Sequence, residues 1–274
     1  MNIAFSTLAC PDWSLDRVLE TAVALGFDGI ELRFVESDDR LWLRPEFTGA
    51  RLRETVHRLR DAGVRVCCLD TSCFFHYAEE SSRQAALEMG RASIGLAAAL
   101  SAPAIRVFGD RVQPGGDRAG TMKWVAEAIR TLAAYGQSFG VATWLETHGD
   151  FSRAADTGAI LTEAGLENTG AIWDPLNSFS EFGEEPEAGF GELGPLVRHV
   201  HIKDARRGAF PWEPVLVGTG DFPARSLIDL LVRRRYQGFV SFEWEKRWHP
   251  QIPPPDVALP HFAQWVRAVR ETHV

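Results

Sequence analysis

Four short apolar runs in the second half of the sequence end in acidic or imidazole side chains. Their closing residues are Glu146, Asp174, the pair His199 and His201, and Glu243. If these runs are neighbouring parallel strands, their carboxyl ends meet at one edge and the four groups converge. Three carboxylates and one imidazole would bind a divalent cation. Because oxygen donors suit harder metals, Mn²⁺, Mg²⁺ or Co²⁺ is favoured over Zn²⁺.

The simpler alternative is that these carboxylates cap helices or pair with arginines at the rim of the fold. A single carboxylate at a strand end fits that alternative as well as it fits a metal site. Four suitable groups on four successive runs, each followed by glycine, proline or polar residues, favour the metal site.

The runs that carry these groups belong to a longer series of strand-like segments. Eight segments are rich in β-branched and apolar residues: 3–8, 28–33, 64–70, 104–109, 141–146, 170–174, 197–203 and 239–243. The intervening segments mostly have helical spacing; in 14–25 an apolar stripe follows Ser14, a suitable N-cap, and ends before Gly26. This alternation predicts an α/β fold, a (β/α)8 TIM barrel, with residues 1–274 forming one domain.

An open Rossmann-like sheet is the alternative fold. It is disfavoured because the first strand-to-helix turn, residues 6–13, contains no glycine, and no GxGxxG follows any predicted strand. Residues 175–196, rich in Gly, Glu and Pro, are expected to form a loop with a degenerate helix. Residues 217–223 are expected to be a turn that leads into a helix at 224–235.

The composition limits the classes of partner. The 274 residues include 29 basic and 37 acidic side chains, a formal net charge of −8, which argues against nucleic acid. The first residues lack the pattern of a signal peptide, and no apolar stretch is long enough to span a membrane. The four cysteines show no CxxC spacing and fit reduced thiols. A cytoplasmic protein is therefore expected.

Several strings of the sequence resemble the sugar phosphate isomerase/epimerase family. They are FST at the first strand, GIELR at the second, LETH at the fifth, WDPLN at the sixth, HVHIKD at the seventh, VGTGDFP after it and FEWEK at the eighth. This xylose-isomerase-like TIM-barrel group includes ketose 3-epimerases, inosose dehydratases and hydroxypyruvate isomerases. The resemblance covers nearly the whole chain, and the last four strings are its most specific motifs.

The resemblance implies a metal site made of Glu146, Asp174, His201 and Glu243. Strand alternation points both His199 and His201 inward, and His201 lies closer to the carboxyl end. His201 is therefore the expected ligand, and His199 is expected to lie in the core or to support a ligand. The expected cofactor is one divalent metal ion, Mn²⁺ foremost, with Mg²⁺, Co²⁺ and Zn²⁺ as alternatives.

The activity that the resemblance implies is proton transfer next to a carbonyl. A metal-dependent isomerase or epimerase would act through a cis-enediolate on a ketose or related polyol ketone. Glu146 is expected to remove the carbon-bound proton and Glu243 to return one. Loss of a β-hydroxyl from the same enediolate would instead make the protein a dehydratase of an inosose-like substrate. The sequence leaves these outcomes, and the identity of the substrate, open.

Further side chains near the same strand ends are candidate substrate contacts. His148 shares the face of Glu146, and two of the three lysines, Lys203 and Lys246, close the seventh and eighth strands. Many family members carry histidine where this chain has Asn177, which can still hydrogen-bond a hydroxyl. The residues expected to bind substrate, Arg207 among them by resemblance, are His148, Asn177, Lys203, Arg207, Lys246, Trp13 and His76.

Other polar and aromatic residues receive structural interpretations. Arg33 is expected to pair with Glu31 inside the barrel, and Glu245 is expected to lie at the rim. Trp173 and Trp244 alternate outward and are expected to pack against the helices.

Two other classes of protein fit the sequence less well than an isomerase. Apurinic-site endonucleases share this fold, but they need a histidine-rich multinuclear metal cluster and a basic surface, which a chain of charge −8 does not offer. A non-catalytic sugar-binding barrel would not require both Glu146 and Glu243. The expected partner is thus a small sugar or polyol, and the sequence leaves open whether the chain forms a homo-oligomer.

Overall fold

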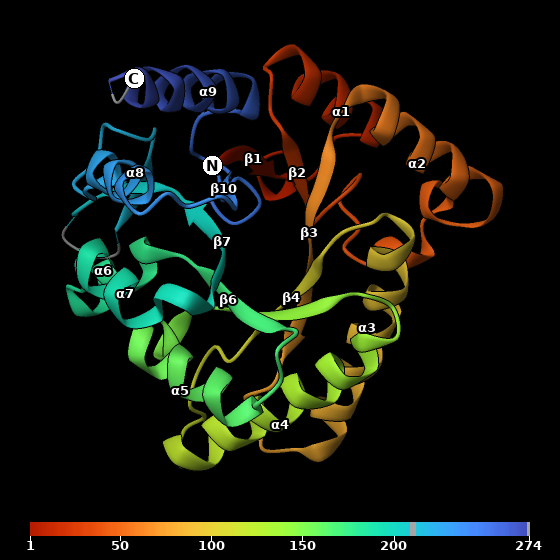
Figure 1. Cartoon of the computed structure of the whole chain (residues 1–274), viewed down its shortest axis with the longest axis vertical. Coiled ribbons are helices and arrows are strands. Elements are labelled where there is room, and N and C mark those ends of the chain that lie inside the picture. The colour runs from red at the N-terminus through yellow and green to blue at the C-terminus, as the bar shows by residue number, and fades with distance from the viewer. Residues whose placement is uncertain (209–211, 273–274) are drawn as a thin grey trace.

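The computed structural model describes residues 1–208 and 212–272, and in it eight parallel strands form a closed barrel (Figure 1). The order around the barrel is β1-β10-β7-β6-β5-β4-β3-β2. The bounds are β1 Asn2–Ser6, β2 Gly29–Leu32, β3 Arg65–Phe74, β4 Ala104–Phe108, β5 Ala142–Glu146, β6 Thr169–Trp173, β7 Val197–Ile202 and β10 Phe239–Phe242. The barrel closes where β1 pairs in parallel with β10, with Asn2 opposite Phe239. The predicted (β/α)8 fold is confirmed.

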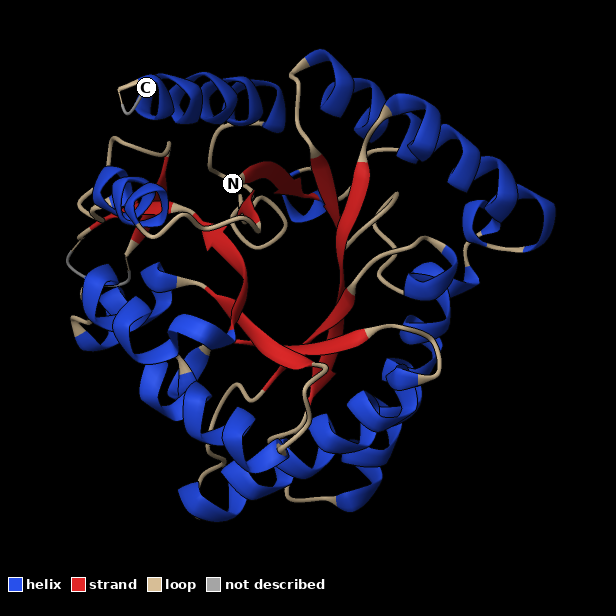
Figure 2. Ribbon diagram, in the orientation of Figure 1, coloured by secondary structure: helices blue, strands red, loops and turns tan. Residues whose placement is uncertain are grey.

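The helices surround the barrel on its outer side (Figure 2). The α-helices are α1 Leu15–Ala24, α2 Gly49–Ala62, α3 Glu80–Ala99, α4 Arg118–Gln137, α5 Ala154–Ala164, α6 Pro175–Phe182, α7 Pro186–Leu193, α8 Ala224–Arg233 and α9 Pro255–Glu271. Short 3-10 helices are η1 Thr7–Ala9, η2 Leu41–Leu43, η3 Pro45–Phe47, η4 Gly149–Phe151 and η5 Gly194–Leu196. As predicted, Ser14 caps α1 by accepting a hydrogen bond from the backbone N–H of Arg17. Among the described residues, no helix combines the length and apolar character needed to cross a membrane.

The segment 175–196 is more regular than the sequence predicted. In place of a loop with a degenerate helix, it forms α6 and α7. Each helix has proline at its start, where the missing N–H costs no hydrogen bond. Gly183 ends α6 in the left-handed conformation at φ 66°. The glycines and prolines that suggested a loop are therefore stop and start signals of two short helices.

A small antiparallel hairpin after β7 was not predicted. It pairs β8 (Asp204–Arg206) with β9 (Glu213–Val215), and strands of three residues leave little periodic signal. The Asp204 carboxylate accepts hydrogen bonds from the backbone N–H groups of Gly218 and Gly220 at 2.8 and 2.9 Å. The predicted turn at 217–223 thus wraps around Asp204 before α8 begins.

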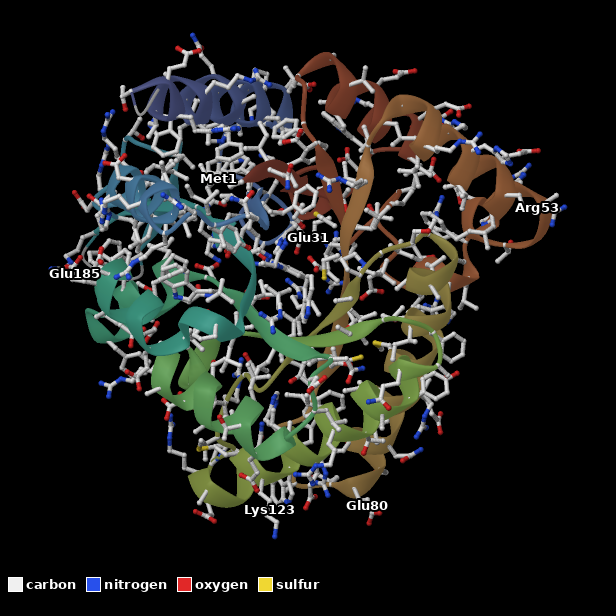
Figure 3. The ribbon with its side chains drawn as sticks, in the orientation of Figure 1. Met1, Glu31, Arg53, Glu80, Lys123 and Glu185 are labelled. Carbon is white, nitrogen blue, oxygen red and sulfur yellow. The ribbon has the colours of Figure 1, made fainter. Side chains whose placement is uncertain are left out.

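Apolar side chains fill the space between barrel and helices, whereas the inside of the barrel carries charge. Trp173 and Trp244 are fully buried in the apolar core, as predicted. Buried charged side chains inside the barrel include Glu31, Asp70 and Arg106. Figure 3 shows Glu31 within the barrel, whereas the labelled charges of the outer helices, such as Arg53 and Lys123, lie at the periphery. Buried charges are tolerated only when they are paired, so these groups must form a network.

Candidate metal centre

The four expected metal ligands come together at the carboxyl end of the barrel. Glu146 ends β5, Asp174 follows β6, His201 lies in β7 and Glu243 follows β10. All four are buried, and one ligand atom from each lies within 4.8 Å of the others. Ligands that bind one ion at roughly 2.0–2.2 Å are at most about 4.4 Å apart, so small side-chain adjustments would bring the four atoms onto one cation.

His201 presents a free ring nitrogen to the three carboxylates. Its Nε2 donates to Glu31 Oε1 at 2.8 Å, so the opposite nitrogen, Nδ1, is the atom that would bind a metal ion. Burial lowers the pKa of His201, but Glu31, Glu243 and Glu146 raise it well above its usual value, so a metal ion would displace a proton from Nδ1. This Nδ1 is buried without a hydrogen-bond partner, 3.5 Å from Glu146 Oε1 and Glu243 Oε1 and 4.0 Å from Asp174 Oδ2. Buried polar atoms without partners are rare, and an unpaired imidazole nitrogen facing carboxylates suits a metal ligand. The donor set therefore fits a divalent ion.

His199 lies deeper in the barrel than this group. Its Nε2 is 2.9 Å from the other Glu31 oxygen, and its ring stacks on Trp144 at 6.0 Å between centroids. Burial alone would raise the pKa of Glu31, but His201 and His199 together hold it well below its usual value. Glu31 is thus a carboxylate shared by two imidazoles, which corrects the prediction that it pairs with Arg33. Arg33 instead contacts Asp39 Oδ2 at 3.4 Å and Ser72 Oγ at 2.6 Å.

Arg106, which the sequence analysis did not single out, reaches into the carboxylate group from β4. Its Nη1 lies 2.9 Å from Glu146 Oε2, 3.3 Å from Glu243 Oε1 and 3.4 Å from Asp70 Oδ2. An arginine in the middle of the apolar run AIRVF was the available signal, because a charge on an inward strand position needs partners inside the barrel. Arg106 holds the two expected catalytic carboxylates at a fixed separation.

Lys203 supplies a second buried positive charge to the cluster of carboxylates, in addition to that of Arg106. Its Nζ lies 2.8 Å from both Asp174 Oδ2 and Glu243 Oε2, and 2.5 Å from Glu245 Oε1. Glu245 therefore belongs to this network as well as to the rim. Burial raises the pKa of Glu243, although Lys203 and His201 oppose the shift.

Glu146 differs from Glu243 in the direction of its pKa shift. Burial would raise its pKa, but Arg106 and His201 lower it to about 2. The two carboxylates thus have different proton affinities within one cluster, an arrangement typical of acid–base sites.

Two of the residues expected to bind substrate, His148 and His76, lie beside Asp110, which the sequence did not identify as a site residue. His148 Nδ1 is 2.9 Å from Asp110 Oδ1, and His76 Nδ1 is 3.8 Å from Asp110 Oδ2. Asn177 lies on α6 and donates from Nδ2 to the backbone oxygen of Thr147 at 3.0 Å. Asp110 itself adopts a left-handed backbone conformation, with φ 60°, which the sequence did not predict.

The remaining candidates have contacts of their own. Trp13 is buried in the apolar core beneath the guanidinium of Arg17. Arg207 stacks over Trp212 at 5.0 Å, and its backbone N–H donates to Asp221. Lys246 donates to the backbone oxygens of Pro250 and Ile252.

A cavity of about 250 Å³ opens above the expected metal ligands. Its walls include Glu146, Glu243, Lys203, His148 and Arg106. In the described part of the chain, the cavity is lined by four carboxylates, four cationic side chains and one imidazole, which suits the deprotonation and reprotonation of a polar molecule.

Comparisons with known proteins agree with this fold. A family model described as a xylose isomerase-like TIM barrel matches residues 19–269. The probable 3-DHS dehydratase AsbF from Bacillus anthracis is 18% identical with a TM-score of 0.80, over 96% of this chain and 98% of that chain. The 3-keto-D-glucoside 4-epimerase YcjR from E. coli is 20% identical with a TM-score of 0.77, over 98% and 99% of the two chains. An L-ribulose 3-epimerase is 18% identical with a TM-score of 0.80, over 99% and 95%.

At these identities the likeness to the three solved structures shows a common fold. No curated protein matches the chain.

Proposed function

The chain belongs to the xylose isomerase-like TIM barrel family, and from this membership we propose that it is a divalent-metal-dependent sugar isomerase or epimerase. It would transfer a proton through a cis-enediolate on a ketose or related polyol ketone. The observation that carries the proposal is the buried group Glu146, Asp174, His201 and Glu243, with ligand atoms within 4.8 Å of one another and an unpaired His201 Nδ1.

These four residues would hold one metal ion, Mn²⁺ foremost, with Mg²⁺, Co²⁺ or Zn²⁺ as alternatives. When bound, the ion would supply Lewis acidity that polarises the carbonyl and favours the negative charge that develops next to it.

The proton transfers belong to the protein's own side chains. Glu146 is the expected base, since its low pKa keeps it ionised, and it would take the proton from the carbon next to the carbonyl. Glu243, which follows a strand separated from β5 by β6 and β7, would return a proton. Return to the opposite face of the same carbon gives an epimer, and return to the neighbouring carbon gives an isomer. Arg106, in contact with both carboxylates, would keep them in position.

A dehydratase acting on an inosose-like substrate is the second candidate, and the Asp110–His148 contact favours it. The 2.9 Å contact to Asp110 orients the His148 ring at the cavity wall. In that reaction Glu146 would take the carbon-bound proton, the bond to the β-hydroxyl would break, and a proton from His148 would let the hydroxyl leave as water.

We further propose a small sugar or polyol as the substrate, one domain over 1–274, and a cytoplasmic location. An apurinic-site endonuclease relative and a non-catalytic sugar-binding barrel are less well supported. The net charge of −8 is unfavourable for nucleic acid, and a sugar-binding barrel has no need for two buried acid–base carboxylates.

Deuterium exchange tests the proposal. The protein, loaded with Mn²⁺ in D₂O, is incubated with a panel of ketoses and inososes, and deuterium at carbon is followed by NMR. We expect exchange that EDTA abolishes and that Glu146→Gln reduces by at least about a hundredfold. Glu127→Gln, an exposed change on α4, is the matched control. Equal exchange with and without EDTA, or in Glu146→Gln, would refute the mechanism.

A further inference from the structure

We propose that the substrate extends beyond the reacting sugar, and that a second sugar unit binds in a neighbouring cavity walled by His76, Tyr77 and Gln113. The substrate class would be a ketose or keto-sugar joined through a glycosidic oxygen to another sugar. This inference rests on the proposed function, because it names the substrate of the same site.

Two adjoining cavities share a wall at the carboxyl end of the barrel. The cavity above the metal ligands measures about 250 Å³, and the neighbouring one measures about 760 Å³. Both are lined by Phe74, Asp110, Arg111 and His148. Pockets for larger organic ligands span roughly 300–1,000 Å³, so the inner cavity suits one small sugar and the outer cavity has room for another ring.

The outer cavity contains a buried polar atom without a partner. His76 is 4% exposed, and its Nδ1 makes no hydrogen bond among the described residues. Burial lowers the pKa of His76, so the ring is neutral near pH 7. Nδ1 lies 3.8 Å from Asp110 Oδ2, too far for a direct hydrogen bond. Asp110 already accepts from Arg111 Nε at 2.9 Å, so Nδ1 is the atom that lacks a partner, and a small rotation of the His76 ring would bring it to a ligand hydroxyl in the cavity.

Aromatic rings and charges in the same cavity favour a neutral, hydroxyl-rich ligand. The rings of His76 and Tyr77 lie 4.3 Å apart, and Phe74 stacks on Phe108 at 4.7 Å. Phe74, His76 and Tyr77 line the outer cavity, and the ring surfaces that these contacts leave uncovered offer apolar area for the C–H groups of a sugar. The described charged residues of this lining are three carboxylates and one guanidinium: Asp110, Asp150, Glu181 and Arg111. This excess of negative charge disfavours a phosphate and suits hydroxyl groups.

The outer cavity is held open by contacts between two loops. The backbone oxygen of Asp110, after β4, accepts a hydrogen bond from the Asp150 N–H at 2.7 Å. The Asp150 carboxylate accepts one from the Val112 N–H at 2.7 Å. Gly149 has φ 57°, and a Cβ there would lie 2.1 Å from the Asp110 oxygen, so only glycine permits this approach. A preformed cavity loses little free energy to ordering when a ligand binds.

Ketose disaccharides test the inference. Fructose is compared with turanose, lactulose, leucrose and isomaltulose, which carry a second sugar on different fructose oxygens. Two measurements are made on the Mn²⁺-loaded protein: deuterium exchange in D₂O and the dissociation constant by calorimetric titration. We expect at least one disaccharide to bind about tenfold more tightly than fructose. Tyr77→Ala, whose residue lines the outer cavity alone of the two, should reduce that ratio about tenfold.

Tyr135→Ala, a tyrosine exposed on the outer face of α4, is the matched control and should leave the ratio unchanged. The inference is overturned if no disaccharide binds more tightly than fructose, or if Tyr77→Ala and Tyr135→Ala give the same ratio. Binding and exchange separate the two proposals. Tight disaccharide binding without metal-dependent exchange would reject the proposed function alone, whereas exchange on fructose without any preference would reject the extended substrate alone.

Discussion

Glu31 connects the bottom of the barrel to the expected metal centre. One of its oxygens faces His199 Nε2 at 2.9 Å and the other faces His201 Nε2 at 2.8 Å. An ionised carboxylate can only accept, so it fixes the proton of His201 on Nε2 and leaves Nδ1 as the ligand atom. A carboxylate behind a histidine ligand in this way orients the ring and raises its basicity.

The change Glu31→Gln should therefore weaken metal binding. An amide accepts through only one atom and carries no charge, so the His201 ring would lose part of its orientation and basicity. We expect the dissociation constant for Mn²⁺, measured by calorimetric titration, to rise about 10- to 100-fold. Glu127→Gln on the surface is the control, and urea unfolding of both variants shows whether the fold is retained. An Mn²⁺ affinity equal to the wild type would show that His201 is oriented by other contacts.

Asp110 should make the free energy of unfolding depend on pH, in a direction that follows from its contacts. Burial would raise its pKa, but hydrogen bonds from His148 and Arg111 lower it to about 2. A carboxyl whose pKa is depressed on folding stabilises the protein above its unfolded pKa, about 3.9, and loses this contribution as the pH falls through the folded value. The contribution should therefore be complete above about pH 4.5 and disappear towards pH 2.

The variant Asp110→Asn tests this by removing the charge at nearly constant size. We expect its free energy of unfolding in urea to lie below that of the wild type at pH 5 and to approach it as the pH falls from 4 to 2. Asp61→Asn, an exposed aspartate at the end of α2, serves as the control. A gap between wild type and Asp110→Asn that stays constant from pH 5 to pH 2 would contradict the depressed pKa.

At the scale of elements, the strands were predictable because their signal is local. Runs rich in β-branched and apolar residues located the eight barrel strands, and Ser14 located the start of α1. The segment 175–196 was misread because composition alone does not distinguish a loop from two short helices that begin with proline. Asp174 also has a local role there, since its carboxylate accepts from the N–H groups of Leu176 and Asn177 at the start of α6.

The contacts between strands were harder to predict, because they depend on register around the barrel. Motif matching named Glu146, Asp174 and Glu243, which occupy neighbouring positions at strand ends. It did not find Arg106, and it gave Glu31 the wrong partner, because residues 31 and 201 lie 170 positions apart and meet only through the closed sheet. Buried charges inside a barrel are paired according to the three-dimensional arrangement, which a single sequence does not contain.

At the scale of elements, we derive one prediction from the contact between the loops after β4 and β5. Gly149→Ala would place a Cβ 2.1 Å from the backbone oxygen of Asp110 at a left-handed φ of 57°. We expect it to lower the free energy of unfolding by more than about 1 kcal/mol, measured in urea. Gly95→Ala is the matched control, because Gly95 is exposed inside α3 with no atom near its added Cβ. There alanine should raise the free energy of unfolding by up to about 1 kcal/mol. Equal effects in both variants would show that the loop contact is not constrained.

On the scale of the whole molecule, barrel closure joins the two ends of the chain. β1 pairs with β10, so the strands nearest the two termini share hydrogen bonds, and the Arg17–Asp256 ion pair at 2.8 Å links α1 to α9. The expected metal ligands lie on or directly after β5, β6, β7 and β10, and they are held in place by Arg106 on β4 and Glu31 on β2. The site therefore depends on strands from both halves of the barrel, and neither half positions it alone.

This dependence predicts that the chain unfolds as one unit and that a bound metal stabilises all of it. Far-ultraviolet circular dichroism reports the helices, and tryptophan fluorescence reports Trp144 inside the barrel and Trp173 and Trp244 in the core around it. We expect coincident urea transitions by both probes. Mn²⁺ at a hundred times its dissociation constant should raise the free energy of unfolding by about 2.7 kcal/mol for the entire transition. Two separated transitions, with Mn²⁺ shifting only one of them, would show that residues 1–274 contain more than one folding unit.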